Sequence, residues 1–146
     1  MTWTDRRYAS FLTRVAASLL DSIWLTAFSS VLGFGLYAAM GMPTPVAQDF
    51  NAVELVASFL APLVLVIAVW RLKQTTPGKA IFRCRIVDAA TGAAPSTGQC
   101  ILRYLGYLPA IFPFGLGLLW VAIDPRRQGW HDKLARTVVV QDTDEA

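Results

Sequence analysis

The chain has 146 residues, which suits a single domain, and 55% of them are hydrophobic while only 16% are charged. Soluble domains contain roughly 45–50% apolar and about 25% charged residues, so this balance favours a membrane protein over a soluble one. The net charge of +3 fits an excess of cytoplasmic Lys and Arg, and no basic run with interleaved aromatic residues indicates a nucleic-acid surface.

The first predicted membrane helix runs from about Thr13 to Tyr37 and carries two charges. Roughly 20 helical residues cover the hydrocarbon core, so this run is long enough to cross a bilayer. Arg14 is expected at the cytoplasmic boundary, and Asp21 lies about 10 Å deeper by the rise of an α-helix. Ser18 is predicted to share one helical face with both charges. A carboxylate at membrane depth is costly, so Asp21 is expected to have a partner inside the protein.

The second predicted membrane helix runs from about Val53 to Trp70, after a loop at residues 38–54 that contains no Lys or Arg. The lack of positive charge places this loop outside the cytoplasm. Pro62 is expected to kink the helix, because a proline removes one backbone hydrogen bond. Ahead of the first helix, residues 1–12 are expected to form a short amphipathic lead-in at the level of the lipid headgroups.

Two polar regions are predicted to be cytoplasmic, because both are rich in Lys and Arg. The first is the loop at residues 71–100, in which residues 80–87 alternate as a β-strand does. TPGK at residues 76–79 resembles part of a phosphate-binding loop but lacks the full motif, and it is predicted to form a turn. The second region, residues 124–146, contains the β-branched run 137–141. The two strands are expected to pair into a small two-stranded β element.

The apolar segment at residues 101–123 differs from the two long helices, because Pro109 and Pro113 interrupt it. Its charged flanks place both of its ends on the cytoplasmic side, and two full crossings would need about 40 residues. We therefore predict a re-entrant segment or a short helical hairpin, with a single crossing as the alternative. The predicted fold is an α-helical integral membrane protein, a single domain over residues 1–146, with two transmembrane helices, this broken segment and the β element.

Three parts of the sequence resemble one protein family. They are TRVAASLLDSIW at residues 13–24, TPGKAIFRCRIVDAATG at 76–92 and GLLWVAIDPRRQGWHDKLARTVVV at 117–140. In this order they resemble the RDD family, a group of small membrane proteins named for one arginine and two aspartates. The resemblance covers nearly the whole chain.

The resemblance implies that Arg14 is the arginine of the family and that Asp21 is the aspartate within the first helix. It assigns the second aspartate to Asp132, with Asp124 as the alternative. It also implies a mostly bacterial and archaeal protein whose biochemical role is largely unassigned. Proton-linked cation transport has been proposed for some members of the family.

These charges suggest a buried network, whose candidate members are Arg14, Asp21, Arg103, Asp124, His131 and Asp132. We predict that Asp21 meets Arg103 and that Asp132 holds Arg14 at the cytoplasmic rim. In the simplest interpretation the network locks helices together, and His131 is a capping or loop residue. Alternatively, Asp21 exchanges a proton for a monovalent cation with help from Ser18, which would require an oligomer, and a homodimer is expected.

No nucleophile with an activating base is visible, so we do not expect an enzyme. Two cysteines outside any CxxC pair and a single histidine argue against a zinc site, and no cofactor is expected. The expected location is the inner (cytoplasmic) membrane, crossed more than once, with both termini in the cytoplasm. The expected partners are the lipid bilayer, a second copy of the chain, and monovalent cations or protons. A structural or assembly partner of other membrane proteins is the alternative to a transporter.

Overall fold

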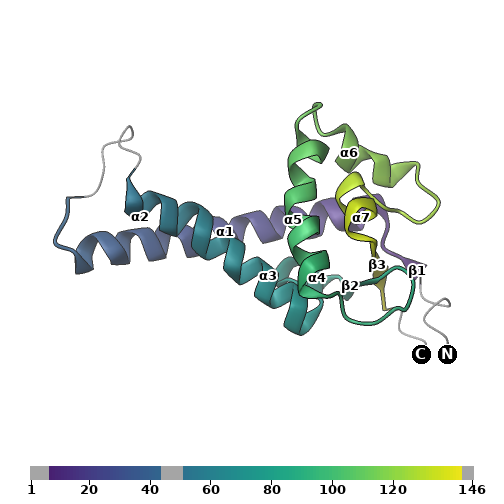
Figure 1. Cartoon of the computed structure of the whole chain (residues 1–146), viewed down its shortest axis with the longest axis horizontal. Coiled ribbons are helices and arrows are strands. Elements are labelled where there is room, and N and C mark those ends of the chain that lie inside the picture. The colour runs from purple at the N-terminus through teal and green to yellow at the C-terminus, as the bar shows by residue number, and fades with distance from the viewer. Residues whose placement is uncertain (1–6, 44–50, 143–146) are drawn as a thin grey trace.

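The computed structural model describes residues 7–43 and 51–142, which form a long helical hairpin with a cap at one end (Figure 1). In chain order the hairpin contains α1 (Phe11–Ala39), α2 (Ala52–Leu55), a π-helical turn η2 (Val56–Leu60) and α3 (Ala61–Lys73). Both arms are long and apolar enough to span a membrane, which confirms the two predicted apolar helices. Each arm is a few residues longer than the sequence predicted. Far from the cap, the Asn51 side-chain amide donates to the Tyr37 hydroxyl at 2.8 Å and ties the arms together.

The returning arm accommodates Pro62 through the π-helical turn rather than through a break. A proline ring clashes with the carbonyl four residues earlier in a regular α-helix. Here the N–H of Ala61 bonds to the carbonyl of Val56, five residues back, and this wider turn stands directly before the proline. The expected disturbance at Pro62 therefore takes the form of one widened turn, and the helix continues to Lys73.

The chain enters α1 from a strand, so the prediction of an amphipathic lead-in is wrong for the residues that the structure describes. β1 (Arg7–Tyr8) pairs antiparallel with β3 (Thr137–Gln141), and the N–H of Ala9 extends the pairing to the carbonyl of Val139 at 3.0 Å. Ser10 then caps α1 by accepting from the N–H of Thr13 at 3.2 Å. Residues 1–6 of the predicted lead-in lie outside the described part.

The cap contains a sheet of three strands rather than two, in the order β1-β3-β2. β2 (Cys84–Asp88) pairs antiparallel with β3, with Cys84 opposite Gln141 and Asp88 opposite Thr137. The predicted pairing is therefore present, and β1 adds the strand that the sequence did not reveal. As the central strand, β3 has both edges hydrogen-bonded, and its three valines are buried on both faces.

The broken apolar segment forms two helical pieces in the cap. α5 (Thr97–Ile111) is followed by α6 (Leu116–Leu119) and a short 3-10 turn, η3 (Trp120–Ala122), and the chain bends by 113° between the pieces. The predicted break is present, but it falls beside Pro113. Pro109 lies within α5, so the prediction that both prolines break the segment is wrong. Gly115 completes the bend with a φ of 74°, a conformation that favours glycine.

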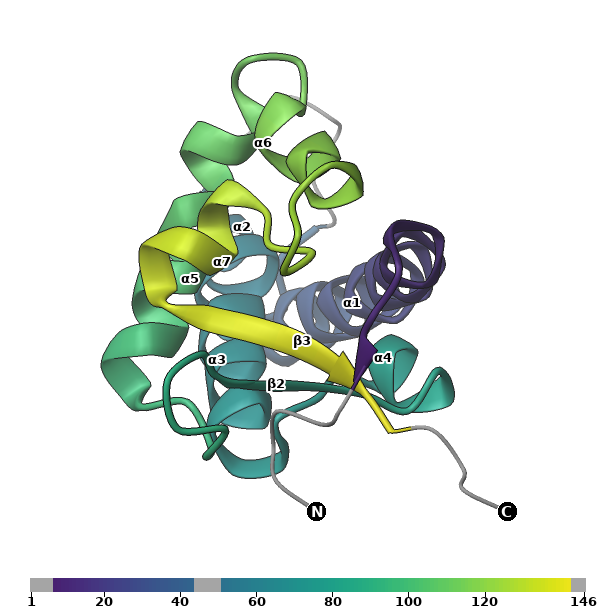
Figure 2. The same ribbon diagram turned by 90° about the vertical axis from the view of Figure 1, so that its right-hand side faces the viewer.

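Two short helices complete the cap, α4 (Pro77–Ile81) and α7 (Trp130–Ala135). Viewed from the cap end, β2 and β3 cross in front of α3, with α1 and α4 on one side and α5 and α7 on the other (Figure 2). Glycine lets α5 and α7 approach closely, because a Cβ on Gly106 would lie 2.8 Å from the Cα of His131. This arrangement brings the first three turns of α1 against both α4 and the segment that leads into α7.

Candidate functional site

Asp21 lies on the face of α1 that packs against α4, and its carboxylate is surrounded by donors. Oδ2 accepts from the hydroxyl of Thr76 at 2.5 Å and from Nζ of Lys79 at 2.7 Å. Oδ1 accepts from the N–H of Gly78 at 2.8 Å and from Nε1 of Trp24 at 3.0 Å. Both Asp21 and Lys79 are buried. The carboxylate therefore has a full set of hydrogen bonds and a cation of its own.

The TPGK segment folds around Asp21, so its prediction as a turn is wrong. Pro77 occupies the first position of α4, where its fixed φ suits a helix and its missing N–H is not needed. The next N–H, that of Gly78, points at the carboxylate, as helix N-termini commonly do with anions. A Cβ on Gly78 would lie 2.3 Å from the carbonyl of Ala17, so glycine is required for this approach. The segment binds an anion as phosphate loops do, and the anion is Asp21.

The predicted pairing of Asp21 with Arg103 is wrong. Lys79 takes that place, three residues after Thr76, in a segment that was predicted to be a turn in a cytoplasmic loop. Arg103 points instead into the contact between α5 and α7, where it is fully buried. It forms an ion pair with Asp132 and donates to the hydroxyl of Thr137 at 2.8 Å.

Asp132 is the second buried anion, and it joins three parts of the chain. Its Oδ2 accepts from Nη2 of Arg14 at 2.6 Å and from the N–H of Gly129 at 2.9 Å, while Oδ1 pairs with Arg103. The expected contact between Arg14 and Asp132 is therefore present. Burial alone would raise the pKa of Asp132, but Arg103 and Arg14 outweigh that effect and hold the pKa well below its usual range. Asp132 is thus an ionised carboxylate that forms ion pairs with two guanidinium groups.

The two arginines around Asp132 have further contacts that fix their places. Nη1 of Arg14 donates to the carbonyl of Arg127 at 2.8 Å, which ties α1 to the turn before α7. The guanidinium carbon of Arg103 lies 5.3 Å from the centre of the Trp70 ring, which ties α5 to the end of α3. The Asp132 cluster therefore connects both arms of the hairpin to the cap.

His131 is a packing residue at the edge of the Asp132 cluster. Its ring stacks on Tyr107 with 4.2 Å between centroids, and its Nε2 lies 3.3 Å from Nη2 of Arg14. Burial lowers the pKa of His131 to about 3, and the neighbouring guanidinium groups act in the same direction. The imidazole is therefore neutral near pH 7, and Nε2 accepts from Arg14 in that state.

Two predicted site residues lie apart from the buried clusters. Asp124 accepts from the N–H groups of Arg126 at 3.0 Å and Gln128 at 3.1 Å and pairs with Lys133, so it stabilises the turn before α7. Burial would raise the pKa of Asp124, but these contacts hold it below the usual value. Ser18 is exposed, and Ala17 takes the buried position on the face of α1.

The structure thus separates the predicted network into two sites. Asp21 belongs to a site with Lys79, whereas Asp132 belongs to a site with Arg14, Arg103 and His131. The sequence analysis missed Thr76, Gly78 and Lys79, although their partial likeness to a phosphate loop was the available signal. Among residues 7–43 and 51–142, no group of His, Cys, Asp and Glu could hold a metal ion.

Comparison with known proteins places this arrangement in a family. The sequence model of the RDD family matches residues 8–136, a range that contains both sites. An uncharacterized protein of Rickettsia prowazekii (strain Madrid E) is 33% identical over 92 residues. This match covers 63% of the present chain and 51% of the relative, so it spans about half of the relative's length. No solved structure matches the chain significantly.

Proposed function

Because this chain belongs to the RDD family, we propose that it is a multi-pass protein of the inner (cytoplasmic) membrane whose buried charges lock a membrane hairpin to a cytoplasmic cap. In this proposal the protein is a structural or assembly partner of other membrane proteins. The name-giving residues then maintain the fold that presents the hairpin and the cap, rather than carrying an ion.

The distribution of charge supports an orientation with the cap, and hence both termini, in the cytoplasm. The arms of the hairpin meet the cap where Arg71 and Lys73 end α3, whereas the segment 38–54 between the arms contains no Lys or Arg. The tip of the broken segment is apolar, with Phe112 93% and Phe114 99% exposed. We place this tip in the cytoplasmic leaflet, as part of a broken segment that starts and ends in the cap and runs across the direction of the hairpin (Figures 1 and 2).

The observation that carries the proposal is the complete set of donors around Asp21. A carboxylate that couples protons to cations must exchange its partners during each cycle. Releasing Asp21 would leave Lys79 buried without an anion, and breaking a buried pair costs about 3–5 kcal/mol. Gly78 and Thr76 would lose their acceptor at the same time. This geometry favours a fixed structural anion over a transport site.

The proposal is tested by measuring proton flux in proteoliposomes with a pH-sensitive dye, adding Na⁺, Li⁺ and K⁺ in turn. The natural protein, Asp21→Asn and Asp124→Asn are compared, because Asp124 is a buried carboxylate outside both sites. We expect no cation-dependent flux from well-folded, inserted protein of any of the three. Flux that is present in the natural protein and in Asp124→Asn but lost in Asp21→Asn would overturn the structural role and identify a transporter.

The assembly role has a test of its own. We expect the natural protein, extracted gently from its own membranes, to co-purify with other membrane proteins or with a second copy of itself, the predicted homodimer. A monodisperse monomer, with no partner after chemical cross-linking in intact membranes, would contradict this role. The exposed apolar side chains along α1, which include Leu19, Ile23 and Val31, are suitable positions for the cross-linking groups.

A further inference from the structure

Three buried N–H groups where α3 packs against α5 have no hydrogen-bond partner among the residues that the structure describes. They are Nε and Nη2 of Arg103 and Nε1 of Trp70. Arg103 is fully buried and Trp70 is 3% exposed, so these groups lie away from bulk water. Buried donors in native proteins are almost always hydrogen-bonded to protein, ordered water or an ion. The three donors therefore indicate an acceptor that residues 7–43 and 51–142 do not supply.

The two unpartnered groups of Arg103 form one edge of its guanidinium. Nη1 is occupied, since it pairs with Asp132 and donates to the hydroxyl of Thr137 at 2.8 Å. On the other edge, Nε and Nη2 each direct one N–H outward, and the two N–H bonds are parallel. This fork matches the two oxygens of a carboxylate, and it can equally hold one spherical anion between its N–H groups.

The charges around Asp132 do not balance. Arg14 and Arg103 both pair with Asp132, and no other carboxylate in the described part of the chain forms an ion pair with either arginine. His131 is neutral near pH 7, because burial holds its pKa at about 3. The cluster therefore keeps one net positive charge largely out of water, which is unfavourable unless an anion balances it.

Tyr107 cannot supply all the missing acceptors. Burial alone would lower the pKa of Arg103, but Asp132 and the nearby hydroxyl of Tyr107 raise it above its usual value. Nε and Nη2 nevertheless remain without a hydrogen-bond partner among the described residues. A small movement of Tyr107 would offer a single phenolic oxygen to three N–H donors. An acceptor from outside the chain is therefore still needed.

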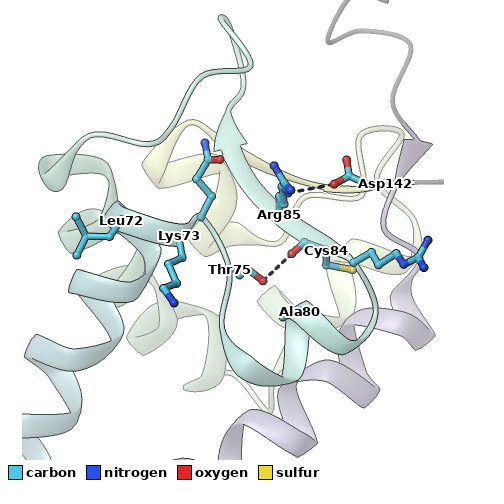
Figure 3. A pocket seen from close by; sticks show the side chains of 9 residues that line it. Leu72, Lys73, Thr75, Ala80, Cys84, Arg85 and Asp142 are labelled. Carbon is cyan, nitrogen blue, oxygen red and sulfur yellow. Dashed lines mark hydrogen bonds and ion pairs between the residues drawn. The ribbon is translucent and has the colours of Figure 1, made fainter. Parts of the chain in front are cut away.

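The indole of Trp70 is held close to the open edge of Arg103. The guanidinium carbon lies 5.3 Å from the centre of the Trp70 ring. The N–H of Gln74 bonds to the carbonyl of Trp70 at 3.1 Å, at the end of α3. The hydroxyl of Thr75 then donates to the carbonyl of Cys84 at 2.8 Å, which ties the end of α3 to β2 (Figure 3). The donors are therefore in place before a ligand binds, which lowers the entropy cost of binding.

We propose that the open edge of Arg103 binds a small monovalent anion, of the size of chloride or formate, with Nε1 of Trp70 as a further donor. The limit on size follows from the burial of both side chains. The anion balances the remaining charge of the Asp132 cluster and links α3 to α5. This inference concerns the interior of the protein and does not depend on the membrane role proposed above.

The test follows the indole N–H signal of Trp70 by NMR in the isotope-labelled full chain in micelles, assigned by its loss in Trp70→Phe. Chloride or formate replaces gluconate at constant pH and ionic strength, because gluconate is a monovalent anion too large for a buried site. Arg103→Lys keeps the positive charge but lacks the fork of two N–H groups. Arg14→Lys is the matched control in the same cluster, since both terminal nitrogens of Arg14 already have acceptors.

We expect the Trp70 signal to shift saturably with chloride and with formate in the natural protein and in Arg14→Lys. In Arg103→Lys the anion concentration that gives half of the shift should rise about tenfold or more, because hydrogen bonds to a charged partner are lost. No saturable shift in the natural protein, or an equal shift of the exposed Trp120 indole, would overturn the proposal. Equal weakening in Arg103→Lys and Arg14→Lys would also overturn it.

The stability of the fold gives a second measurement that does not require Arg103→Lys to fold. A ligand that binds only the folded protein stabilises it by mass action. Chloride should therefore stabilise the natural protein and Trp120→Phe more than Trp70→Phe, which keeps an aromatic ring but loses the indole N–H. In gluconate, Trp70→Phe should be about as stable as the natural protein, since the lost N–H has no acceptor among the described residues. Equal stabilisation of all three by chloride would overturn the role of Trp70, and no stabilisation of any would overturn the anion site.

Discussion

Replacing Asp132 with asparagine is expected to destabilise the protein more than any other single loss of charge among the described residues. The side chain is fully buried and pairs with Arg14 and Arg103. Removing its charge leaves two guanidinium groups buried without an anion. Loss of one partner of a buried pair costs about 3–5 kcal/mol, and here one substitution breaks two pairs. Since small domains unfold with about 5–15 kcal/mol, the variant should lose a large share of its stability.

The change is measured as the free energy of unfolding in mixed micelles, followed by tryptophan fluorescence. Asp124→Asn is the matched control, because its charged partner Lys133 is 45% exposed. The other contacts of Asp124 are hydrogen bonds from backbone N–H groups, which the side-chain oxygen of asparagine can still accept. We expect a loss of at least about 3 kcal/mol for Asp132→Asn and about 1 kcal/mol or less for Asp124→Asn. Equal losses in the two variants would refute the argument that Asp132 stabilises two buried cations.

Three further outcomes are expected from the geometry. Gly78→Ala should destabilise the fold by at least about 2 kcal/mol in the same unfolding assay, because the new Cβ would lie 2.3 Å from a backbone carbonyl oxygen of α1. Gly98→Ala is the control and should be nearly neutral, because its new Cβ would have no neighbour closer than 3.9 Å. Burial lowers the pKa of His131 to about 3 in the folded state, so the unfolded chain takes up a proton near pH 6.5 and stability falls as the pH drops below that value. The loss should reach about 2 kcal/mol at pH 5, and a His131→Phe variant that lacks this slope would confirm the source, since the chain has no other histidine. A nitroxide on Phe114→Cys should collide more with oxygen than with a polar nickel complex in liposomes, whereas the same label on Ala90→Cys should show the reverse; a water-exposed Phe114 would contradict the membrane placement of the tip.

The helical hairpin could be predicted from the sequence, because long apolar runs have few other stable arrangements. The break at Pro113 was also predictable, since charge placed both ends of the segment on one side. β1 was not predictable, because two residues cannot form a strand alone and Arg7–Tyr8 forms a strand through its pairing with β3. Its contribution depends on a partner that lies at the other end of the chain.

The partners of the buried charges could also be predicted from the sequence only in part. An argument from the expected depth of each charge matched Arg14 with Asp132 correctly but paired Asp21 with the wrong cation. Lys79 was assigned to a turn in a cytoplasmic loop, although α4 folds back and buries it against Asp21. Spacing along α1 was equally ambiguous, because positions three and four residues apart both lie near one face. In the structure Ala17 is buried on this face of α1, whereas Ser18 is exposed.

The most direct test of the central claim, that Asp21 is a fixed structural anion, is a double-mutant cycle with Asp21→Asn and Lys79→Met. A second cycle joins Asp21→Asn to Arg103→Met. We predict a coupling free energy of at least about 1 kcal/mol between Asp21 and Lys79, because the pair is buried and hydrogen-bonded, and close to zero between Asp21 and Arg103. No coupling between Asp21 and Lys79, or a larger coupling with Arg103, would contradict the account.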